Sequence, residues 1–281
     1  MTPGKVSIVI LNWNQWAITA QCLNSLSMLD YPDFEVILVD NASDSPPPAE
    51  ITSIIPDTVL IRNSANFGFG KGNNPGIRRA MGNGSEFIWL LNNDTEVMAD
   101  TLSLLVSKIS ESPGIGAAGT GILSFDNETV LAWGGGKVNM RRFYTCNLHA
   151  ASPGEMPDYL TAASMLLRSE ALKQTGLFDE RFFMYWEDID LCFRLKQNGW
   201  TLAVAGEAKI LHMEGSSSES IVKAYYEFHS VIYFASKYAR HYIPAVCWIV
   251  FDRIIKRLAM LKFIWLFKFI VISFRYKQQV I

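Results

Sequence analysis

The segment VSIVILN, at residues 6–12, is a short continuous run of apolar and β-branched residues. Such a run is typical of a strand buried on both faces, as in a parallel sheet. Three further runs share this character: FEVILVDNAS at 34–43, TVLIRN at 58–63 and EFIWLLNND at 86–94. Helical patterns near 16–28 and 71–82 lie between them. The alternation predicts an α/β domain with a mostly parallel sheet.

The composition excludes several classes of protein. The chain has 281 residues, 49% hydrophobic and 19% charged, which excludes a disordered protein and allows a large core. The formal net charge of −2 argues against nucleic acid as a partner. The four cysteines are widely spaced, without a C-x-x-C pair, and suit a reducing cytosol. The amino-terminal apolar run lacks a small-residue cleavage site, so we interpret it as a strand rather than a signal peptide.

Polar side chains follow three of the predicted strands. Ligands bind open α/β sheets at the carboxyl ends of the strands, whereas a single Asn or Asp is as readily a helix cap. Three such ends together favour a ligand site. The residues concerned are Asn12, Asn14, Asp40, Asn41, Asn92, Asn93 and Asp94.

Asp94 is the candidate metal ligand. A carboxylate at a strand end can hold Mg²⁺ or Mn²⁺, which prefer oxygen ligands and leave positions for water or phosphate. Helix capping is the alternative interpretation. His212 becomes a second ligand if the fold brings it to Asp94, because imidazole also binds manganese; otherwise it is structural or solvated. The stretch 215–218, GSSS, either donates hydrogen bonds to phosphate or forms a plain loop.

The segment FMYWEDIDLCFRLKQNGW, at 183–200, is the most unusual in the chain. Its pattern predicts a helix over 187–197 that stops at Gly199. Acids in a first helical turn favour the helix dipole, which is the structural explanation for Glu187, Asp188 and Asp190. Three crowded acids also repel one another, and a carboxylate near apolar rings can serve as a general base.

Two glycine-rich regions are less specific. The segment NFGFGKGNN, at 66–74, does not match G-x-G-x-x-G, so it fails as a dinucleotide-binding fingerprint. It remains a candidate turn where backbone approaches a ligand. Around Gly134–Gly136 the sequence predicts hairpins and loops laid against the sheet over 115–165, where an acceptor pocket can form.

In this order, six segments resemble those of family 2 glycosyltransferases, and more narrowly the bacterial rhamnosyltransferase-like branch. They are VSIVILNWN, VDNASD, NFGFGKGNN, LLNNDTEV, FMYWEDIDLCFRL and LHMEGSS, and the resemblance covers about residues 5–218. It implies a GT-A fold, a Rossmann-like sheet flanked by helices, in a domain of residues 1–220. It also implies transfer of a sugar from a nucleoside diphosphate donor, with inversion at the anomeric carbon.

The same resemblance implies roles for individual residues. Asp40 matches the acid that binds the pyrimidine base, and Asp188, preceded by Glu187, matches the catalytic base. Asp94 and His212 match the metal ligands, although Asn92 replaces the first acid of the metal motif. The remaining positions are expected to line the donor: Asn12, Asn14, Asn41, Asn66, Gly68, Asn73, Asn92 and Asn93.

The implied substrates follow from the family. The donor is a dTDP- or UDP-sugar, with rhamnose as the first expectation. The acceptor is a saccharide or a lipid-linked glycan in cell-surface polysaccharide synthesis. A nucleotidyltransferase is the alternative enzyme, but NWNQW near the first strand has no basic group for a triphosphate. A non-catalytic, membrane-associated module that binds sugar nucleotides is the second alternative, and Asp94, Asp188 and His212 argue against it.

Residues 221–281 have a different character. They contain ten Lys and Arg against two acids, whereas residues 1–220 contain fifteen against twenty-five. Cations interrupt the apolar run 242–274, and no charge-free stretch reaches the ~20 residues that a membrane span needs. The pattern predicts a basic amphipathic helical tail at the inner face of the cell membrane, in a cytoplasmic, peripherally attached protein. The alternative is a helical pair packed on the domain or on a second copy in a homodimer.

Overall fold

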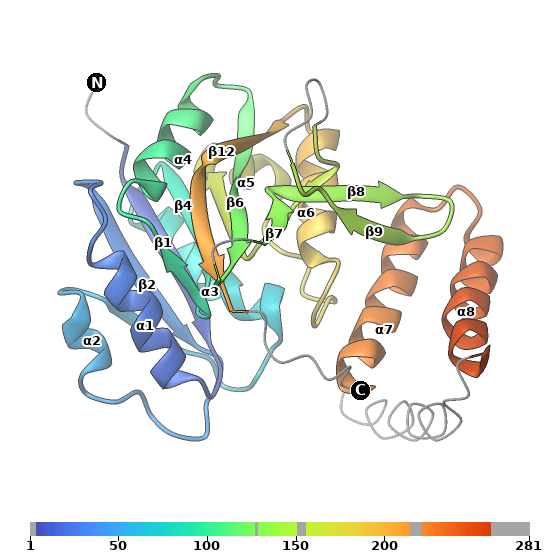
Figure 1. Ribbon diagram of the computed structural model, residues 1–281, viewed down its shortest axis with the longest axis horizontal. Coiled ribbons are helices and arrows are strands. Elements are labelled where there is room, and N and C mark those ends of the chain that lie inside the picture. Colours follow the sequence, from blue (N-terminus) through green and yellow to red (C-terminus); the bar gives the residue numbers. More distant parts are fainter. Residues whose placement is uncertain (1–3, 127–128, 151–155, 214–220, 260–281) are drawn as a thin grey trace.

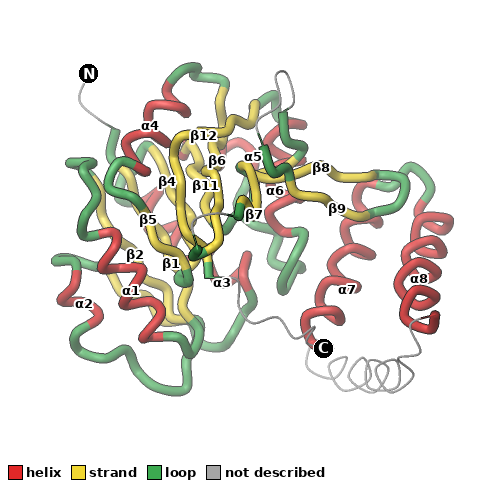
Figure 2. Tube along the Cα trace, viewed as in Figure 1, coloured by secondary structure: helices red, strands yellow, loops and turns green. Residues whose placement is uncertain are grey.

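The computed structural model describes residues 4–126, 129–150, 156–213 and 221–259. One curled sheet runs through the molecule with helices on both of its faces, and a helical pair extends from one side (Figure 1). Helices α1 Trp16–Leu26, α2 Ile51–Ile54 and α4 Thr101–Ser110 cover one face. Helices α3 Phe69–Gly82, α5 Ser169–Thr175 and α6 Glu187–Gln197 cover the other. Figure 2 shows this layering.

The described residues form a 12-stranded sheet. Its main path runs in the order β10-β8-β7-β6-β11-β4-β1-β2-β3, with β12 beside β5 and β6, and β9 beside β8. The strands are β1 Val6–Asn12, β2 Phe34–Asp40, β3 Val59–Arg62, β4 Phe87–Asn92, β5 Thr95–Val97, β6 Ile115–Ser124, β7 Val130–Trp133, β8 Gly135–Asn139, β9 Tyr144–Asn147, β10 Tyr159–Leu160, β11 Ser164–Arg168 and β12 Thr201–His212.

The first half of the sheet is parallel, as the sequence predicts. Strand β1 lies between β2 and β4, with Asn12 opposite Asp40 and Leu11 opposite Asn92. Strand β3 continues the parallel order, with Arg62 opposite Asp40. The carboxyl ends of these strands therefore meet at one edge, where the polar side chains collect.

The middle of the chain differs in part from its prediction. Strands β7, β8 and β9 form the expected hairpins. Strand β6, however, is not laid against the sheet but lies inside it, antiparallel to β11 and parallel to β12. Its sequence, IGAAGTGILS, is buried over nearly its whole length. Alanine and glycine carry little strand preference, so the local pattern conceals a central strand that only the neighbouring strands define.

Helix α3 begins two residues before its prediction, at Phe69, and packs unusually close to the sheet. A Cβ added at Gly76 would lie 2.7 Å from Val9 Cγ1 and 2.8 Å from Val39 Cγ2. Only glycine permits this approach, since real Cβ contacts are longer. The close contact places the amino-terminal end of α3 at the polar edge of the sheet.

The carboxy-terminal helices are α7 Ile221–Tyr238 and α8 Tyr242–Ala259. Helix α7 packs on the α/β part of the molecule. Its residues Val231, Phe234 and Ala235 belong to the same buried cluster as Leu191 of α6. Helix α8 packs beside α7. Among the described residues, no helix combines the length and apolarity that crossing a bilayer requires. The tail beyond residue 259, with the cations at 262 and 268, lies outside the described residues, as does the predicted loop 215–218.

Replacing Gly76 by alanine tests this packing. We expect Gly76→Ala to lower the free energy of unfolding by about 1–2 kcal/mol, because the new methyl group overpacks Val9 and Val39. Gly82, at the end of the same helix, has no atom within 4 Å of an added Cβ. Gly82→Ala should therefore raise stability by up to about 1 kcal/mol. Urea unfolding of both variants provides the comparison, and a stabilised Gly76→Ala would contradict the packing argument.

Candidate active site

Ser43 connects the first two strand-end loops and was not among the predicted site residues, although it lies within the segment VDNASD. Its Oγ accepts hydrogen bonds from Asn12 Nδ2 at 3.1 Å and from the Asn14 backbone N–H at 2.9 Å. Its own N–H donates to Asp40 Oδ1 at 2.9 Å. Asn14 also exchanges two hydrogen bonds with Asp44. The loops after β1 and β2 are therefore held as one unit.

Asp40 is fully buried and compensated by a cation. Arg62 Nη1 lies 2.9 Å from its Oδ2, and Arg62 Nη2 donates to the carbonyl of Ser43 at 2.8 Å. The side chain of Arg62 is 49% exposed, so the ion pair reaches the surface on the arginine side. A buried carboxylate needs such a partner, because an unpaired charge in the interior is costly.

Asn41 organises the glycine-rich loop. Its Nδ2 donates to Asn66 Oδ1 at 2.9 Å and to the carbonyl of Gly68 at 3.1 Å, and its Oδ1 accepts from Asn63 at 2.9 Å. Gly68 has a φ of +77°, and a Cβ there would lie 1.9 Å from the carbonyl oxygen of Phe183. The loop thus lies against the chain just before the acidic helix α6.

Two residues that were expected to line the sugar-nucleotide donor, Asn93 and Asn73, differ in their contacts. Asn93 is joined to the first loop, because its Nδ2 donates to Gln15 at 3.2 Å and to Thr19 Oγ1 at 3.0 Å. Asn73 is buried within α3 and donates to the carbonyl of Phe69 at 3.0 Å. No hydrogen bond among the described residues connects Asn73 with the other predicted ligands.

Asp94 and His212 meet, as a metal site requires. Strand β12 pairs antiparallel with β5 so that its last residue, His212, lies opposite Thr95. His212 Nε2 lies 3.1 Å from Asp94 Oδ1 and 3.4 Å from Asn92 Nδ2. Asp94 Oδ1 is buried and accepts no hydrogen bond, so its polar contact is the His212 Nε2 atom that would share a bound cation with it.

This pair suits a hard divalent cation with an open coordination sphere. The described residues contain no group of three or more His, Cys, Asp or Glu that could hold a metal. This edge of the sheet therefore does not surround a metal ion with protein ligands alone. Mg²⁺ usually takes one or two carboxylates together with water and substrate phosphates, and imidazole is also a ligand for transition ions such as Mn²⁺.

The acidic segment begins α6 as predicted. Tyr185 and Trp186, directly before the helix, have φ values of 67° and 70°. This left-handed backbone conformation is rare for residues other than glycine. Burial raises the pKa of Asp188 to about 6. The backbone N–H groups of Ile189, at 2.8 Å, and Ala162, at 3.3 Å, oppose that rise by donating to its carboxylate.

For Glu187 the opposing hydrogen bond comes from its own backbone N–H. Its side chain is buried, and its Oε2 has no hydrogen-bond partner. Burial raises the pKa of Glu187 well above its usual value, and the charge of the adjacent Asp188 raises it further. The two neighbouring carboxyls therefore differ, with the proton favoured on Glu187 and the charge on Asp188.

The acidic helix and the metal-site pair lie at the same edge of the sheet. Asp188 accepts from Ala162, and the next residue, Ala163, accepts a 2.9 Å hydrogen bond from the backbone N–H of Asn92. One dipeptide thus links the predicted base to the end of β4. The structure brings together Asp40, Asn12, Asn93, Asp94, His212 and Asp188, which come from five separate segments.

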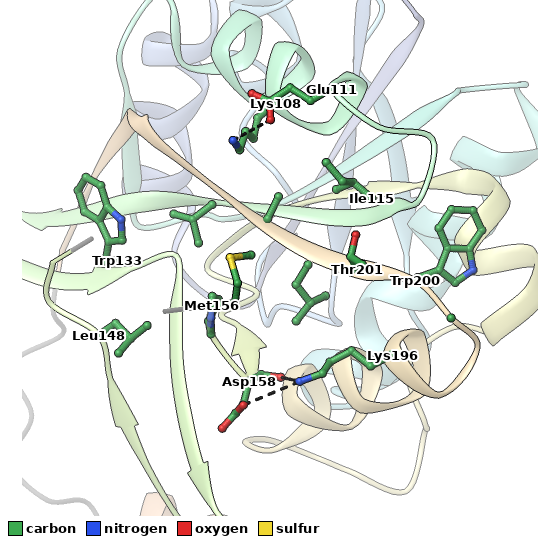
Figure 3. Close-up of a pocket in the computed structure, with 15 residues that line it drawn as sticks. Lys108, Glu111, Ile115, Trp133, Leu148, Met156, Asp158, Lys196, Trp200 and Thr201 are labelled. Carbon is green, nitrogen blue, oxygen red and sulfur yellow. Dashed lines mark hydrogen bonds and ion pairs between the residues drawn. The ribbon is translucent and has the colours of Figure 1, made fainter. Parts of the chain in front are cut away.

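A cavity of about 900 Å³ lies elsewhere (Figure 3). It is lined by Thr201 at the start of β12, by Trp133 and by Trp200. His212 is at the opposite end of the same strand. None of the predicted site residues lines this cavity, so it is separate from the candidate active site.

Comparison with known proteins agrees with this architecture. Residues 3–225 match the model of the family described as glycosyltransferase like family 2. The N-acetylglucosaminyl-diphospho-decaprenol L-rhamnosyltransferase of Mycobacterium tuberculosis is 29% identical over 220 residues, which cover 70% of this chain and 72% of that protein.

Two solved glycosyltransferase structures share the fold. GalNAc-T7 with UDP, GalNAc and Mn²⁺ aligns with a TM-score of 0.65 at 15% identity, covering 85% of this chain and 49% of that chain. The mannosyltransferase PcManGT of Pyrobaculum calidifontis, in complex with GDP-Man and Mn²⁺, aligns with a TM-score of 0.59 at 14% identity, covering 88% and 69%. The fold is GT-A, and the chain belongs to glycosyltransferase family 2.

Proposed function

We propose that this chain is an inverting, metal-dependent glycosyltransferase that moves a sugar from a nucleoside diphosphate donor to an acceptor hydroxyl. The observation that carries the proposal is that two groups of complementary chemistry are connected to the same end of β4. Asp188 offers a carboxylate whose pKa lies near 6, and Asp94 with His212 offers a cation site. Inversion in a single displacement needs a base on one side and stabilisation of the leaving group on the other.

Asp188 takes the proton of the acceptor hydroxyl. The acceptor oxygen then bonds to the anomeric carbon while the bond from that carbon to the diphosphate oxygen breaks. With a pKa of about 6, Asp188 is ionised at neutral pH and is a stronger base than an ordinary aspartate. The hydrogen bonds from Ile189 and Ala162 orient its carboxylate. Glu187, with its proton, adds no second charge.

Asp94 and His212 would hold the cation at the edge of the sheet that faces the diphosphate. A bound Mg²⁺ or Mn²⁺ supplies positive charge that stabilises the departing diphosphate. Because Asn92 stands where a second acid would add charge, a cation here would have only Asp94 as a charged protein ligand, with His212 beside it. The loops tied together by Ser43 and Asn41 form the nucleotide-facing edge. Asp40 is the proposed acceptor for the pyrimidine base, which requires Arg62 to release its Oδ2.

The relatives support a narrower choice of substrate. We propose rhamnose from a dTDP- or UDP-activated donor and a lipid-linked acceptor, because the mycobacterial relative is named for L-rhamnose transfer to a diphospho-decaprenol-linked sugar. The setting is then the synthesis of a cell-surface glycan, on the cytoplasmic side of the membrane.

We also propose that α8 binds the membrane surface. Its inner side packs through Ala245 and Ile249, which are buried. Its outer side exposes an apolar stripe in which Ile243 is 73%, Trp248 36% and Phe251 55% exposed. Residues 221–281 carry ten cations and two acids, a balance that complements an anionic lipid surface. A lipid-linked acceptor would be reached from that position.

Replacing the base tests the mechanism. We expect Asp188→Asn to lower kcat by about 10²–10⁴-fold, because the amide cannot accept the proton, while nucleoside diphosphate still binds. In the wild type, kcat/KM should fall about tenfold per pH unit below pH 6, as Asp188 becomes protonated. Glu170→Gln, an exposed carboxylate on α5, is the matched control. Near wild-type transfer by Asp188→Asn would disprove the assignment.

The same variant should be more stable than the wild type. The folded-state pKa of Asp188 is raised from 3.8 to about 6, so burial favours the protonated carboxyl and stability declines as pH rises through that range. An amide avoids this cost, and we expect Asp188→Asn to raise Tm by roughly 2–6 °C at pH 7.5. Calorimetry at pH 7.5 and pH 4 measures the difference, which should shrink at the lower pH.

Removing the metal ligands tests the cation site. We expect Asp94→Asn and His212→Ala to weaken the Mn²⁺-dependent binding of nucleoside diphosphate by about tenfold or more, and EDTA to abolish transfer by the wild type. Asp100→Asn, at an exposed position before α4, should change neither result. Calorimetric titration with and without Mn²⁺ gives the answer; unchanged metal dependence in Asp94→Asn would place the cation elsewhere.

Adding charge to the outer side of α8 tests membrane binding. We expect Ile243→Asp/Phe251→Asp to abolish flotation of the full chain with vesicles rich in phosphatidylglycerol, which the wild type should bind. Met28→Asp, at another apolar side chain with 71% exposure, is the control and should float normally. Equal flotation of all three proteins would exclude α8 as the docking surface, and failure of the wild type to float would favour a second copy as the partner.

A further inference from the structure

Helix α7 lies along the segment that leads into the acidic helix. Tyr226 stacks on Phe183 with 4.2 Å between ring centroids, and Ser230 donates to the carbonyl of Met184 at 2.7 Å. One turn further along α7, the ring of Phe234 lies 4.8 Å from that of Trp186. Successive turns of α7 therefore contact successive residues of the segment.

These contacts support a turn before α6 whose backbone conformation is unfavourable by itself. Tyr185 and Trp186 both have positive φ, a conformation that persists in such residues only where the surrounding structure supports it. Trp186 directly precedes Glu187 and Asp188, so its conformation decides where the first turn of α6 points. Trp186 is only 4% exposed, and Phe234 of α7 is fully buried against it. The strained turn is thus held from outside by α7.

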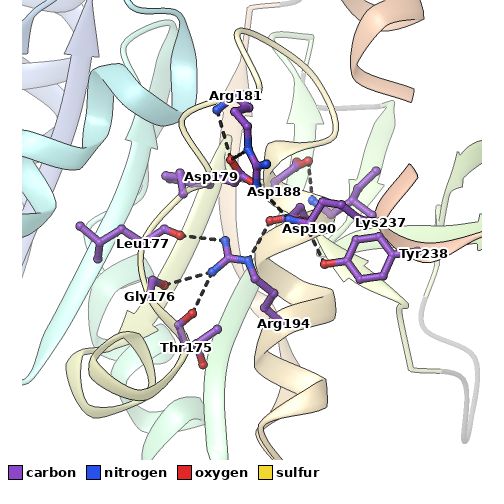
Figure 4. Close-up of polar contacts among 12 residues, drawn as sticks. Thr175, Gly176, Leu177, Asp179, Arg181, Asp188, Asp190, Arg194, Lys237 and Tyr238 are labelled. Carbon is purple, nitrogen blue, oxygen red and sulfur yellow. Dashed lines mark hydrogen bonds and ion pairs between the residues drawn. The ribbon is translucent and has the colours of Figure 1, made fainter. Parts of the chain in front are cut away.

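Lys237, in the last turn of α7, joins the two ends of the same segment. Its Nζ pairs with Asp179 at 2.9 Å and with Asp190, which is fully buried. Figure 4 shows Lys237 and Tyr238 converging on Asp190 from one side while Arg194 approaches it from another. The Tyr238 hydroxyl donates to Asp190 Oδ1 at 2.9 Å, and Arg194 Nε donates to Oδ2 at 2.8 Å.

Asp179 is equally constrained. The Tyr233 hydroxyl donates to its Oδ2 at 2.9 Å, and Arg181 forms an ion pair with it at 2.9 Å. Hydrogen bonds from Arg181 and Lys237 hold the pKa of Asp179 far below its usual value. One ammonium group therefore bridges residue 179, before the strained turn, and residue 190, after the pair Glu187–Asp188.

We propose that α7 is part of the catalytic unit and that Lys237 is a positioning residue, which fixes Asp188 by bridging Asp179 and Asp190 around the strained turn. This inference rests on the proposed function of Asp188 as the base. Residues 3–225 match the family model, so Tyr226, Ser230, Phe234 and Lys237 lie beyond the matched segment. The catalytic part of the chain accordingly extends to Tyr238 and does not end near residue 220.

The Lys237 bridge affects the position of Asp188 and takes no part in the reaction itself. Lys237 contacts two carboxylates, neither of which is the proposed base, and the nucleotide-facing residues belong to other elements. Losing the bridge should therefore leave donor binding intact and misplace Asp188 relative to the acceptor. Small misplacements of a reacting group cost as much as about 10²-fold in rate.

The test compares kcat with the donor KM in the full chain. We expect Lys237→Met to lower kcat by about 10–100-fold while the donor KM changes less than threefold, and Lys237→Arg, which keeps the charge, to restore kcat to within about fivefold of wild type. Lys173→Met removes a lysine whose ion pair with Glu170 is more than half exposed on both sides, and it should change neither constant. A folded Lys237→Met with kcat within threefold of wild type would overturn the inference.

A second variant tests the inference even if Lys237→Met does not fold. Tyr233→Phe removes only the hydroxyl that donates to Asp179, so it should fold and lower kcat by about threefold to tenfold at constant donor KM. If Lys237→Met does not fold, an unchanged kcat in Tyr233→Phe overturns the inference. Asp188→Asn separates the two claims. If it keeps transfer, the proposed base is wrong. If it is inactive while Lys237→Met is normal, only the role of α7 is wrong.

Discussion

The parallel register of β1 with β2 and β4 is the constraint on which the rest of the site depends. These strands are buried on both faces, so a slip of one residue would pack each side chain against the opposite layer of helices and shift the polar strand ends out of line. The register places Asn12 opposite Asp40 and Asn92 beside Leu11. The polar loops therefore begin at a common edge, and the hydrogen bonds of Ser43 and Asn93 join them there.

The site combines a rigid polar frame with a few groups left without full partners. Asn41 and Ser43 are buried and fully engaged, so they stabilise the loops at the expense of their own availability. Asp40 Oδ2, Asp94 Oδ1 and Glu187 Oε2 are buried without a hydrogen bond, although Arg62 and His212 lie within ion-pair distance of the first two. Such unsatisfied atoms are costly in a folded protein, and their presence at one edge of the sheet is consistent with a ligand that completes them.

Much of the fold could be predicted from local patterns. The runs that became β1, β2 and β4 are apolar and β-branched, and the acidic helix has both a start signal and the stop signal Gly199. Strand β6 could not be predicted in this way, because its glycines and alanines have no strand preference of their own. The meeting of Asp94 with His212 depended on how β12 pairs with β5. The family resemblance anticipated that meeting, whereas spacing alone did not.

The sequence by itself determined the parallel half of the sheet, the polar strand ends and the acidic start of α6, because each rests on residues close together in the chain. The tertiary structure alone decided which carboxyl keeps its proton, since burial and backbone donors distinguish Glu187 from Asp188. It also decided the place of α7. Nothing near Lys237 indicates that its ammonium group reaches Asp179 and Asp190, because that bridge exists only after the aromatic contacts of α7 bring three distant segments together.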